Sequence, residues 1–194
     1  MKQSSVFSDK QFVLRAFSTL IDYPESKESL ADQLEILDNN FVSDSKNRIK
    51  PLKKWMNSQS LGSLQEAYTG IFDINSLCSP YIGYHLFGED YKRSLLLTGL
   101  KEKFRLFGFD QPYDEMPDHL SVVLKFLSTL TDEGFYSELI KEALEPSVEK
   151  MLSEINPVET NDDKSSNEMS TRNFYASILA ALKNFIKSEV KNDQ

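Results

Sequence analysis

Apolar residues recur at intervals of three and four along most of this 194-residue chain. Near the C-terminal end, for example, Phe174, Ile178, Leu182 and Phe185 follow one another in this way. Such spacing places the apolar side chains on one face of an α-helix. The chain contains only 7 Gly and 7 Pro, too few turn signals for a many-stranded sheet. We therefore expect an all-α fold, a bundle of about eight to ten helices that forms one domain over residues 1–194.

The net charge of the protein limits the kinds of molecule that it can bind. Lys and Arg number 22 against 30 Asp and Glu, a formal net charge of -8, which repels nucleic acid and anionic membrane surfaces. A basic segment of another protein would instead be attracted. No apolar run resembles a signal peptide or reaches membrane-spanning length, so we expect a cytoplasmic protein without stable membrane insertion.

Cysteine and histidine are scarce. The single cysteine, Cys78, excludes an internal disulfide, and two histidines without a CxxC pattern do not match an ordinary zinc site. The sequence therefore predicts neither a bound metal nor another cofactor.

The stretch YDEMPDHLSVVLKF, residues 113–126, combines acids, a proline and a histidine at the start of an apolar helix. Proline is favoured at the first helical position, which would make Met116 the cap, Asp118 the second residue and His119 the third. There Asp118 would complement the helix dipole. His119 would lie at the edge of the buried stripe as a neutral, partly buried imidazole beside carboxylates.

Three roles are open to such an imidazole: a general base, a metal ligand together with His85 and Glu115, or a structural clamp between helices. The clamp is favoured because structural networks gather the same residue types, and no Ser or Cys nucleophile motif accompanies His119. From the residues alone, the alternatives are a small metal-dependent hydrolase using Glu115, Asp118 and His119, or a generic helical adaptor.

A second stretch, SPYIGYHLFGEDYKR, covers residues 79–93. It predicts a short helix opened by Ser79 and Pro80, a bend at Gly88, and a longer helix closed by Gly108. Tyr81, Tyr84 and His85 fall on one side of the short helix, so they are either core residues or the lining of a half-wet peptide groove. Glu89 and Arg93 are spaced as a helical ion pair.

The C-terminal region divides into two parts. Residues 156–170 are polar and predict a mobile linker, whereas residues 171–191 carry a continuous apolar stripe. We expect this last helix to dock on the bundle.

Two motifs, YTGIFDINSLCSPYIGYHLFGEDYKR (residues 68–93) and EMPDHLSVVLKFL (residues 115–127), carry a family resemblance. They resemble the molybdoenzyme assembly chaperones of the nitrate reductase delta-subunit (NarJ) group, which are related to the TorD and DmsD redox-enzyme maturation proteins. The resemblance implies a TorD/NarJ-like helical fold and a chaperone that is not an enzyme.

The same resemblance implies a partner. This is the N-terminal segment of the catalytic subunit of a molybdopterin-containing oxidoreductase, of nitrate reductase or nitrite oxidoreductase type, kept competent for molybdenum cofactor insertion, assembly or export. Contacts with cofactor-delivery proteins are a further expectation. The peptide-binding residues it implies are Tyr68, Phe72, Tyr81, Tyr84, His85, Phe87, Glu89, Glu115, Asp118 and His119.

Overall fold

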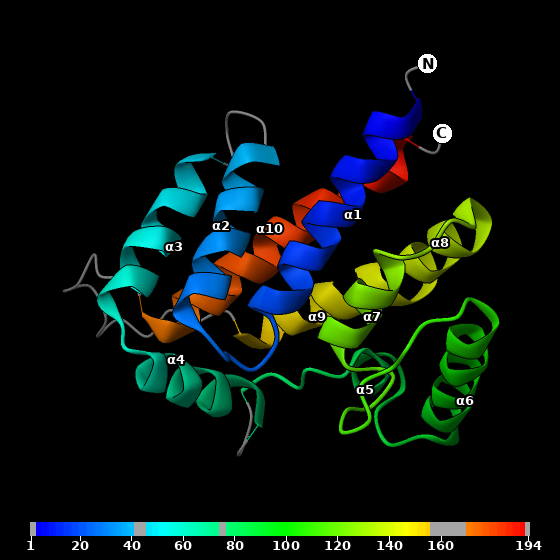
Figure 1. The fold of residues 1–194 in the computed structure, drawn as a ribbon. Helices are drawn as coiled ribbons and strands as arrows, with labels where there is room; N and C mark the ends of the chain where they lie inside the picture. The colour runs from blue at the N-terminus through cyan, green and yellow to red at the C-terminus, as the bar shows by residue number, and fades with distance from the viewer. Residues whose placement is uncertain (1–2, 41–45, 74–76, 156–169, 193–194) are drawn as a thin grey trace.

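The computed structural model describes residues 3–40, 46–73, 77–155 and 170–192, and this part of the chain is all-α (Figure 1). Its α-helices are α1 (Gln3–Leu20), α2 (Lys27–Asn40), α3 (Lys46–Ser58), α4 (Leu61–Tyr68), α5 (Ile82–Phe87), α6 (Tyr91–Leu106), α7 (Leu120–Leu127), α8 (Glu133–Leu139), α9 (Glu145–Ile155) and α10 (Thr171–Asn192). Two π-helical segments, Thr69–Asp73 and Ile140–Leu144, continue α4 and α8. The ten α-helices in the described ranges confirm the predicted fold class.

The long helices α1 and α10 lie side by side in the middle of the molecule, with α2 and α3 on one flank and α7 and α9 beneath (Figure 1). Helix α6 lies at the edge, next to α5. The predicted stripe of α10 is buried, and Phe174 packs against the ring of Trp55 at a centroid distance of 4.7 Å. Docking of the last helix is therefore confirmed.

Two predicted helix starts are wrong for one physical reason. Helix α7 begins at Leu120 with His119 as its cap, and α5 begins at Ile82, so Pro117 and Pro80 lie outside the helices. The two approach segments bond to each other instead, because Leu120 N–H donates to the Pro80 carbonyl (2.8 Å) and Ile82 N–H donates to that of Asp118 (2.9 Å). This pairing holds the two cap residues, Tyr81 and His119, in an extended conformation, so each helix begins only after its cap.

Local sequence features explain three other helix boundaries. Helix α1 begins at Gln3, and no Gly or Pro interrupts the helix-compatible residues that follow up to Leu20. Helix α4 is capped by Ser60, whose Oγ accepts the Ser63 N–H. Pro146 is the second residue of α9, and the π-helical segment Ile140–Leu144 immediately precedes this helix.

The bends fall where glycine was expected to place them. Gly88 and Gly108 have φ values of 64° and 67°, a region that disfavours other residues, and they end α5 and α6. The predicted linker lies outside the described residues except for Ser170, so its mobility stays a prediction. Within the described ranges, no helix combines the length and the apolar character needed to cross a membrane.

Candidate functional site

The two sequence motifs meet at a short antiparallel pairing of Tyr81 with His119. The backbone hydrogen bonds on either side of this pair hold the start of α5 against the start of α7. The Tyr81 ring also contacts the His119 ring edge-on, with centroids 5.4 Å apart. Tyr81 and Glu115, which are 34 positions apart in the sequence, are thereby held together. We call this part of the molecule the paired corner: Tyr81, Gly83, Arg93, Glu115, Asp118 and His119.

His119 is buried, and both of its ring nitrogens have partners. Nδ1 lies 3.2 Å from the Ser121 N–H and 2.7 Å from the Ser121 Oγ, while Nε2 lies 3.2 Å from the Tyr68 hydroxyl. A backbone N–H can only donate, so Nδ1 is the acceptor and the proton of the neutral ring is on Nε2. His119 therefore caps α7 and ties it to α4, as a structural clamp does.

The burial of His119 makes its protonation unfavourable. Desolvation lowers its pKa from the ordinary value of 6.5, and the nearby carboxylates of Glu115, Asp22 and Asp118 oppose this shift only in part. A histidine whose folded pKa lies below its unfolded pKa takes up fewer protons in the folded state. The stability it contributes is full above the unfolded pKa of 6.5 and is lost as the pH falls below it.

We therefore expect the free energy of unfolding to decrease between about pH 7.5 and pH 5.5, and to decrease less in a His119→Asn variant. Asparagine keeps a capping oxygen for the Ser121 N–H but does not titrate. Urea unfolding of both proteins at the two pH values gives the change in the free energy of unfolding for each. The other titrating groups contribute equally to both changes, so the difference between the changes reports on His119. Equal pH dependence of the two proteins would contradict a titrating role for His119.

Asp118 is fully buried and forms an ion pair with Arg93. Arg93 Nε donates to Asp118 Oδ2 at 3.0 Å, and the Nη2 group lies 3.5 Å from Oδ1. The predicted pair of Glu89 with Arg93 is therefore replaced by this one across the corner. Asp118 is held inside the fold and does not present its charge to a partner at the surface.

Gly83 makes this ion pair possible. A Cβ atom at this position would lie 2.7 Å from Asp118 Oδ2, closer than real Cβ contacts, and 3.2 Å from Arg93 Cγ. Only a residue without a side chain leaves room for the carboxylate to lie against α5.

We expect Gly83→Ala to lower the free energy of unfolding by about 1–3 kcal/mol, because the buried pair must shift to admit the methyl group. The matched control is Gly99→Ala in α6, where an added Cβ meets no heavy atom within 4 Å. That substitution should be neutral or stabilise by up to about 1 kcal/mol. Chemical denaturation measures both, and equal effects would refute the crowding argument.

An acidic cleft of about 690 Å³ opens beside the paired corner. It lies between the α1–α2 connection and the segment before α7. The described residues that line it include four acids and one basic residue: Asp22, Glu25, Asp114, Glu115 and Lys125. Glu115 belongs to both the cleft and the paired corner, since its Oε1 accepts a hydrogen bond from the Tyr81 hydroxyl at 3.2 Å. Burial and this carboxylate raise the pKa of Tyr81 to about 12, so the hydroxyl remains a donor at neutral pH.

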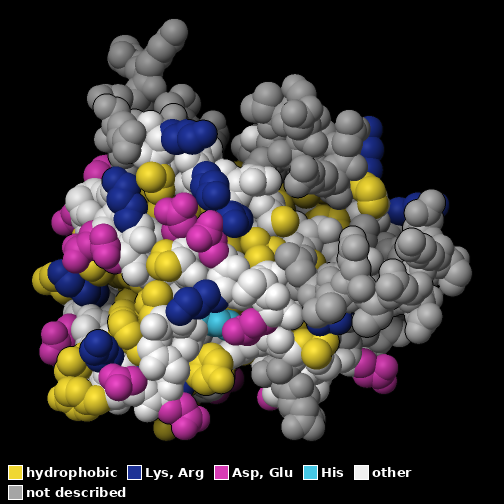
Figure 2. Space-filling view, turned by 180° about the vertical axis from the view of Figure 1, so that it is seen from behind, with side chains coloured by type: hydrophobic (Ala, Val, Ile, Leu, Met, Phe, Trp, Pro, Cys, Tyr) yellow, Lys and Arg dark blue, Asp and Glu magenta, His cyan; other side chains and the backbone are white. Residues whose placement is uncertain are grey.

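An apolar groove of about 280 Å³ lies between α5, α6 and α8. Its lining includes Leu86, Phe87, Leu96, Phe135 and Leu139. Seen from behind, hydrophobic side chains also gather on the surface at the edge of the molecule where α6 lies (Figure 2). Among them, Leu95 and Leu106 on α6 are exposed. The groove and this exposed face of α6 are thus apolar, in contrast to the acidic cleft.

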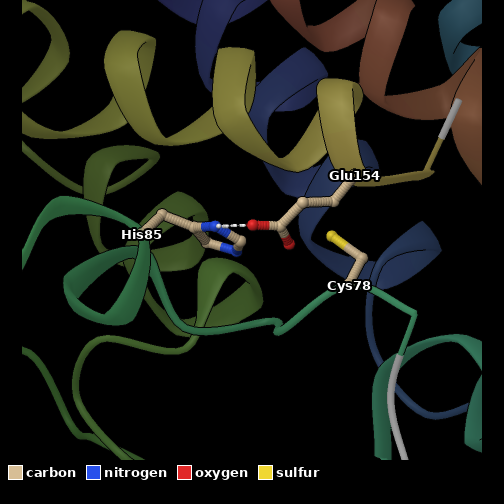
Figure 3. Close-up of side chains that lie close together, drawn as sticks. All are labelled: Cys78, His85 and Glu154. Atoms are coloured by element: carbon tan, nitrogen blue, oxygen red, sulfur yellow. Dashed lines mark ion pairs between the residues drawn. The ribbon is translucent and has the colours of Figure 1, made fainter. Parts of the chain in front are cut away.

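The other histidine belongs to a different cluster. His85 is buried beneath α9, its Nε2 lies 2.7 Å from the Ser79 carbonyl oxygen, and its Nδ1 lies 3.4 Å from Glu154 Oε1 (Figure 3). The Cys78 thiol is the third member of this cluster. The grouping of His85 with Glu115 and His119 as metal ligands is therefore wrong: among the described residues, His85 clusters with Cys78 and Glu154 instead.

The ten residues implied as peptide ligands are thus spread over four environments. Tyr68 and Phe72 are buried and pack on each other and on Tyr175, so they support the surface from below. Tyr81, Asp118 and His119 form the paired corner with Glu115, which also lines the acidic cleft. Tyr84, Phe87 and Glu89 are on the exposed side of α5 and the turn after it, and His85 is in the second cluster.

Sequence reasoning missed Asp22, Tyr23 and Glu25 in the cleft. On its own, the Tyr23-Pro24 pair indicates only the end of a helix, because the residue before a proline disfavours the helical conformation. The signal available was the concentration of acids on both sides of an exposed tyrosine, DYPE, but nothing in the sequence indicates that this segment faces Asp114 and Glu115.

Fold and site together define an all-α protein whose paired corner is held by structural contacts and whose neighbouring cleft is acidic. Comparison with known proteins then gives the family: residues 38–157 match the nitrate reductase delta subunit family. The chain belongs to this family, whose members are chaperones rather than enzymes. The hydrolase alternative and the generic adaptor are both overturned by this membership.

Two relatives illustrate the match. The chain is 26% identical over 129 residues to the probable nitrate reductase molybdenum cofactor assembly chaperone NarJ of Bacillus subtilis (strain 168), which covers 66% of this chain and 70% of that protein. Its fold is similar to the crystal structure of a candidate redox enzyme maturation protein from Archaeoglobus fulgidus, with a TM-score of 0.61 and 21% identity over 91% of this chain and 93% of the other.

Proposed function

We propose that this protein is a cytoplasmic chaperone that binds the N-terminal segment of the catalytic subunit of a nitrate reductase-type molybdoenzyme and keeps it competent for molybdenum cofactor insertion. Membership of the delta subunit family carries the proposal, together with the role that the name of the Bacillus relative states. The whole chain acts as one chaperone unit, with no catalytic step of its own.

The acidic cleft is the proposed docking place for this segment. Its lining contains four carboxylates against one lysine, so a basic peptide would be attracted over a distance of about one Debye length, roughly 8–10 Å at moderate salt. The half-exposed ring of Tyr23 adds apolar contact area at the rim. Its position is supported from behind by Tyr68, which it meets edge-on at 5.6 Å.

The paired corner serves this cleft as its rigid wall. The side chain of Glu115 is held by the Tyr81 hydroxyl and by the Met116 N–H at 2.7 Å, so this carboxylate is fixed before a peptide arrives. Preorganised groups lose less conformational entropy on binding. The buried Asp118 and His119 hold the wall in place and do not touch the peptide. In this assignment they are positioning residues.

The test is calorimetric titration of the full chain with a peptide from the N-terminus of the partner catalytic subunit. We expect saturable one-to-one binding that weakens as salt rises, and a loss of affinity of at least about tenfold in an Asp22→Asn/Glu25→Gln/Asp114→Asn variant. All three side chains are exposed, so the variant should fold normally.

A charge-matched control separates local from general electrostatics. The control variant is Asp32→Asn/Glu66→Gln/Glu102→Gln. It also removes three negative charges, but from exposed positions outside the cleft lining. It should bind the peptide nearly as well as the unaltered protein. Equal weakening in both variants would place the peptide elsewhere, and absence of binding to the unaltered protein would refute the proposed function.

A further inference from the structure

The hydrogen bonds of His85 define its tautomer and leave one ring nitrogen to which no group donates a hydrogen bond. A backbone carbonyl only accepts, so the Nε2 that lies 2.7 Å from the Ser79 oxygen carries the proton of the neutral ring. The lone pair is then on Nδ1, which is buried and has no hydrogen-bond partner among the described residues. It faces a carboxylate oxygen, Glu154 Oε1, at 3.4 Å. Two electron-rich atoms at this distance repel each other unless a proton or a metal cation lies between them.

A third electron-rich atom points toward the same place. The buried Sγ of Cys78, the Nδ1 of His85 and a carboxylate oxygen of Glu154 lie within 4.8 Å of one another. Figure 3 shows the three side chains converging from the segment before α5, from α5 itself and from α9. Thiolate, imidazole and carboxylate are the three side-chain ligands that zinc takes in proteins.

We propose that Cys78, His85 and Glu154 bind a divalent transition-metal ion, for which Zn²⁺ is the best match. Bonds of about 2.0–2.2 Å from zinc to nitrogen and oxygen in a tetrahedral site separate those two ligands by about 3.4 Å. The Nδ1 and Oε1 atoms are already 3.4 Å apart. A zinc-bound sulfur would lie about 3.6 Å from each of the other two ligand atoms, so a shift of Sγ on the order of 1 Å completes the geometry.

Three protein ligands leave the fourth tetrahedral position for water. As the zinc–sulfur bond forms, the Cys78 thiol releases its proton to solvent, and no electron is transferred. The Ser79 carbonyl holds the remote ring N–H of His85, which is the usual way a metal-binding histidine is oriented. Lys150 of α9 further fixes this turn by donating to the His85 carbonyl at 2.6 Å.

The ion would join three separate elements of the fold. It would hold the Cys78 segment, α5 and α9 together, and α5 carries the exposed rings of Tyr84 and Phe87. Zinc would therefore raise the melting temperature of the folded protein, because it binds a site that the unfolded chain does not contain.

The experiment uses the full chain after treatment with a chelator. Competition with a chromophoric chelator should give one Zn²⁺ per chain, and Co²⁺ in its place should give a thiolate-to-cobalt charge-transfer band with the intense visible absorption of a tetrahedral ion. Glu154→Gln should weaken zinc binding by at least about tenfold, and Cys78→Ser should abolish the charge-transfer band. The Glu154 side chain is 42% exposed, so its variant tests the site even if Cys78→Ser fails to fold.

Glu102→Gln is the matched control, an exposed acid on α6 that should leave both the affinity and the spectrum unchanged. The proposal is overturned by any of three results: less than one zinc bound per chain, a cobalt spectrum without a thiolate band, or a Glu154→Gln variant that binds zinc as tightly as the control. Because no peptide is involved, failure here would leave the peptide titrations unaffected.

Discussion

Replacing Arg93 with methionine is expected to lower the free energy of unfolding by about 3 kcal/mol, one of the largest effects of any single substitution in this protein. The reason is the partner left behind: Asp118 is fully buried, and Arg93 is the cation that faces it. An uncompensated buried carboxylate costs about 3–5 kcal/mol, and the lower end applies because the Arg93 side chain is 22% exposed. In a chain of this length the melting temperature should fall by roughly 6–12 °C.

Two further variants identify the cause. Lys92→Met, an exposed neighbour on the same helix, should change the melting temperature by no more than about 2 °C. Adding Asp118→Asn to Arg93→Met removes the stranded charge and should recover part of the loss, which a double-mutant cycle by thermal denaturation measures. If Arg93→Met melted like the Lys92 control, the ion pair would not be a stabilising element of the corner.

Truncating Phe174 to alanine should lower the free energy of unfolding by about 3–5 kcal/mol and change the fluorescence of the only tryptophan. Phe174 is buried at the start of α10 and lies against Trp55 of α3. The truncation opens a cavity between these helices and exposes the indole to a new environment. Far-UV circular dichroism and tryptophan emission, followed together through urea unfolding, measure both effects.

Asn173→Ala provides the comparison, since its side chain is exposed one position earlier on α10. It should change neither the tryptophan emission nor the stability by more than about 0.5 kcal/mol. An unchanged emission spectrum in Phe174→Ala would mean that Trp55 does not report on the packing of α10.

The sequence was sufficient for the fold because the fold depends on short-range periodicity. Apolar spacing identifies each helix, and glycines with a strong positional preference mark the bends at Gly88 and Gly108. Helix starts were harder to predict at Pro80 and Pro117. Local rules place a proline at the first helical position, whereas here two distant segments form hydrogen bonds with each other and delay both helices.

The candidate site was less predictable because its contacts are long-range. His119 was expected to be a neutral, partly buried imidazole at the third helical position, whereas it is the buried cap residue of α7. Its partner Tyr68 is 51 residues away, and the Arg93 that neutralises Asp118 is 25 residues away. No periodicity encodes such pairs. The same holds for Glu154, which lies beside His85 only because α9 crosses α5.

The central position of α10 also constrains how the protein folds during synthesis. Helix α10 packs against α1, α3 and α9 and consists of residues 171–192 (Figure 1). The ribosome therefore makes it after every element against which it packs. Until then Phe17, Trp55 and Phe72 lack the aromatic neighbours that α10 supplies. Nascent chains that end before residue 171 therefore expose an apolar groove, a surface that general folding factors recognise and that favours aggregation. Completion of the core therefore waits for the synthesis of α10 in this protein.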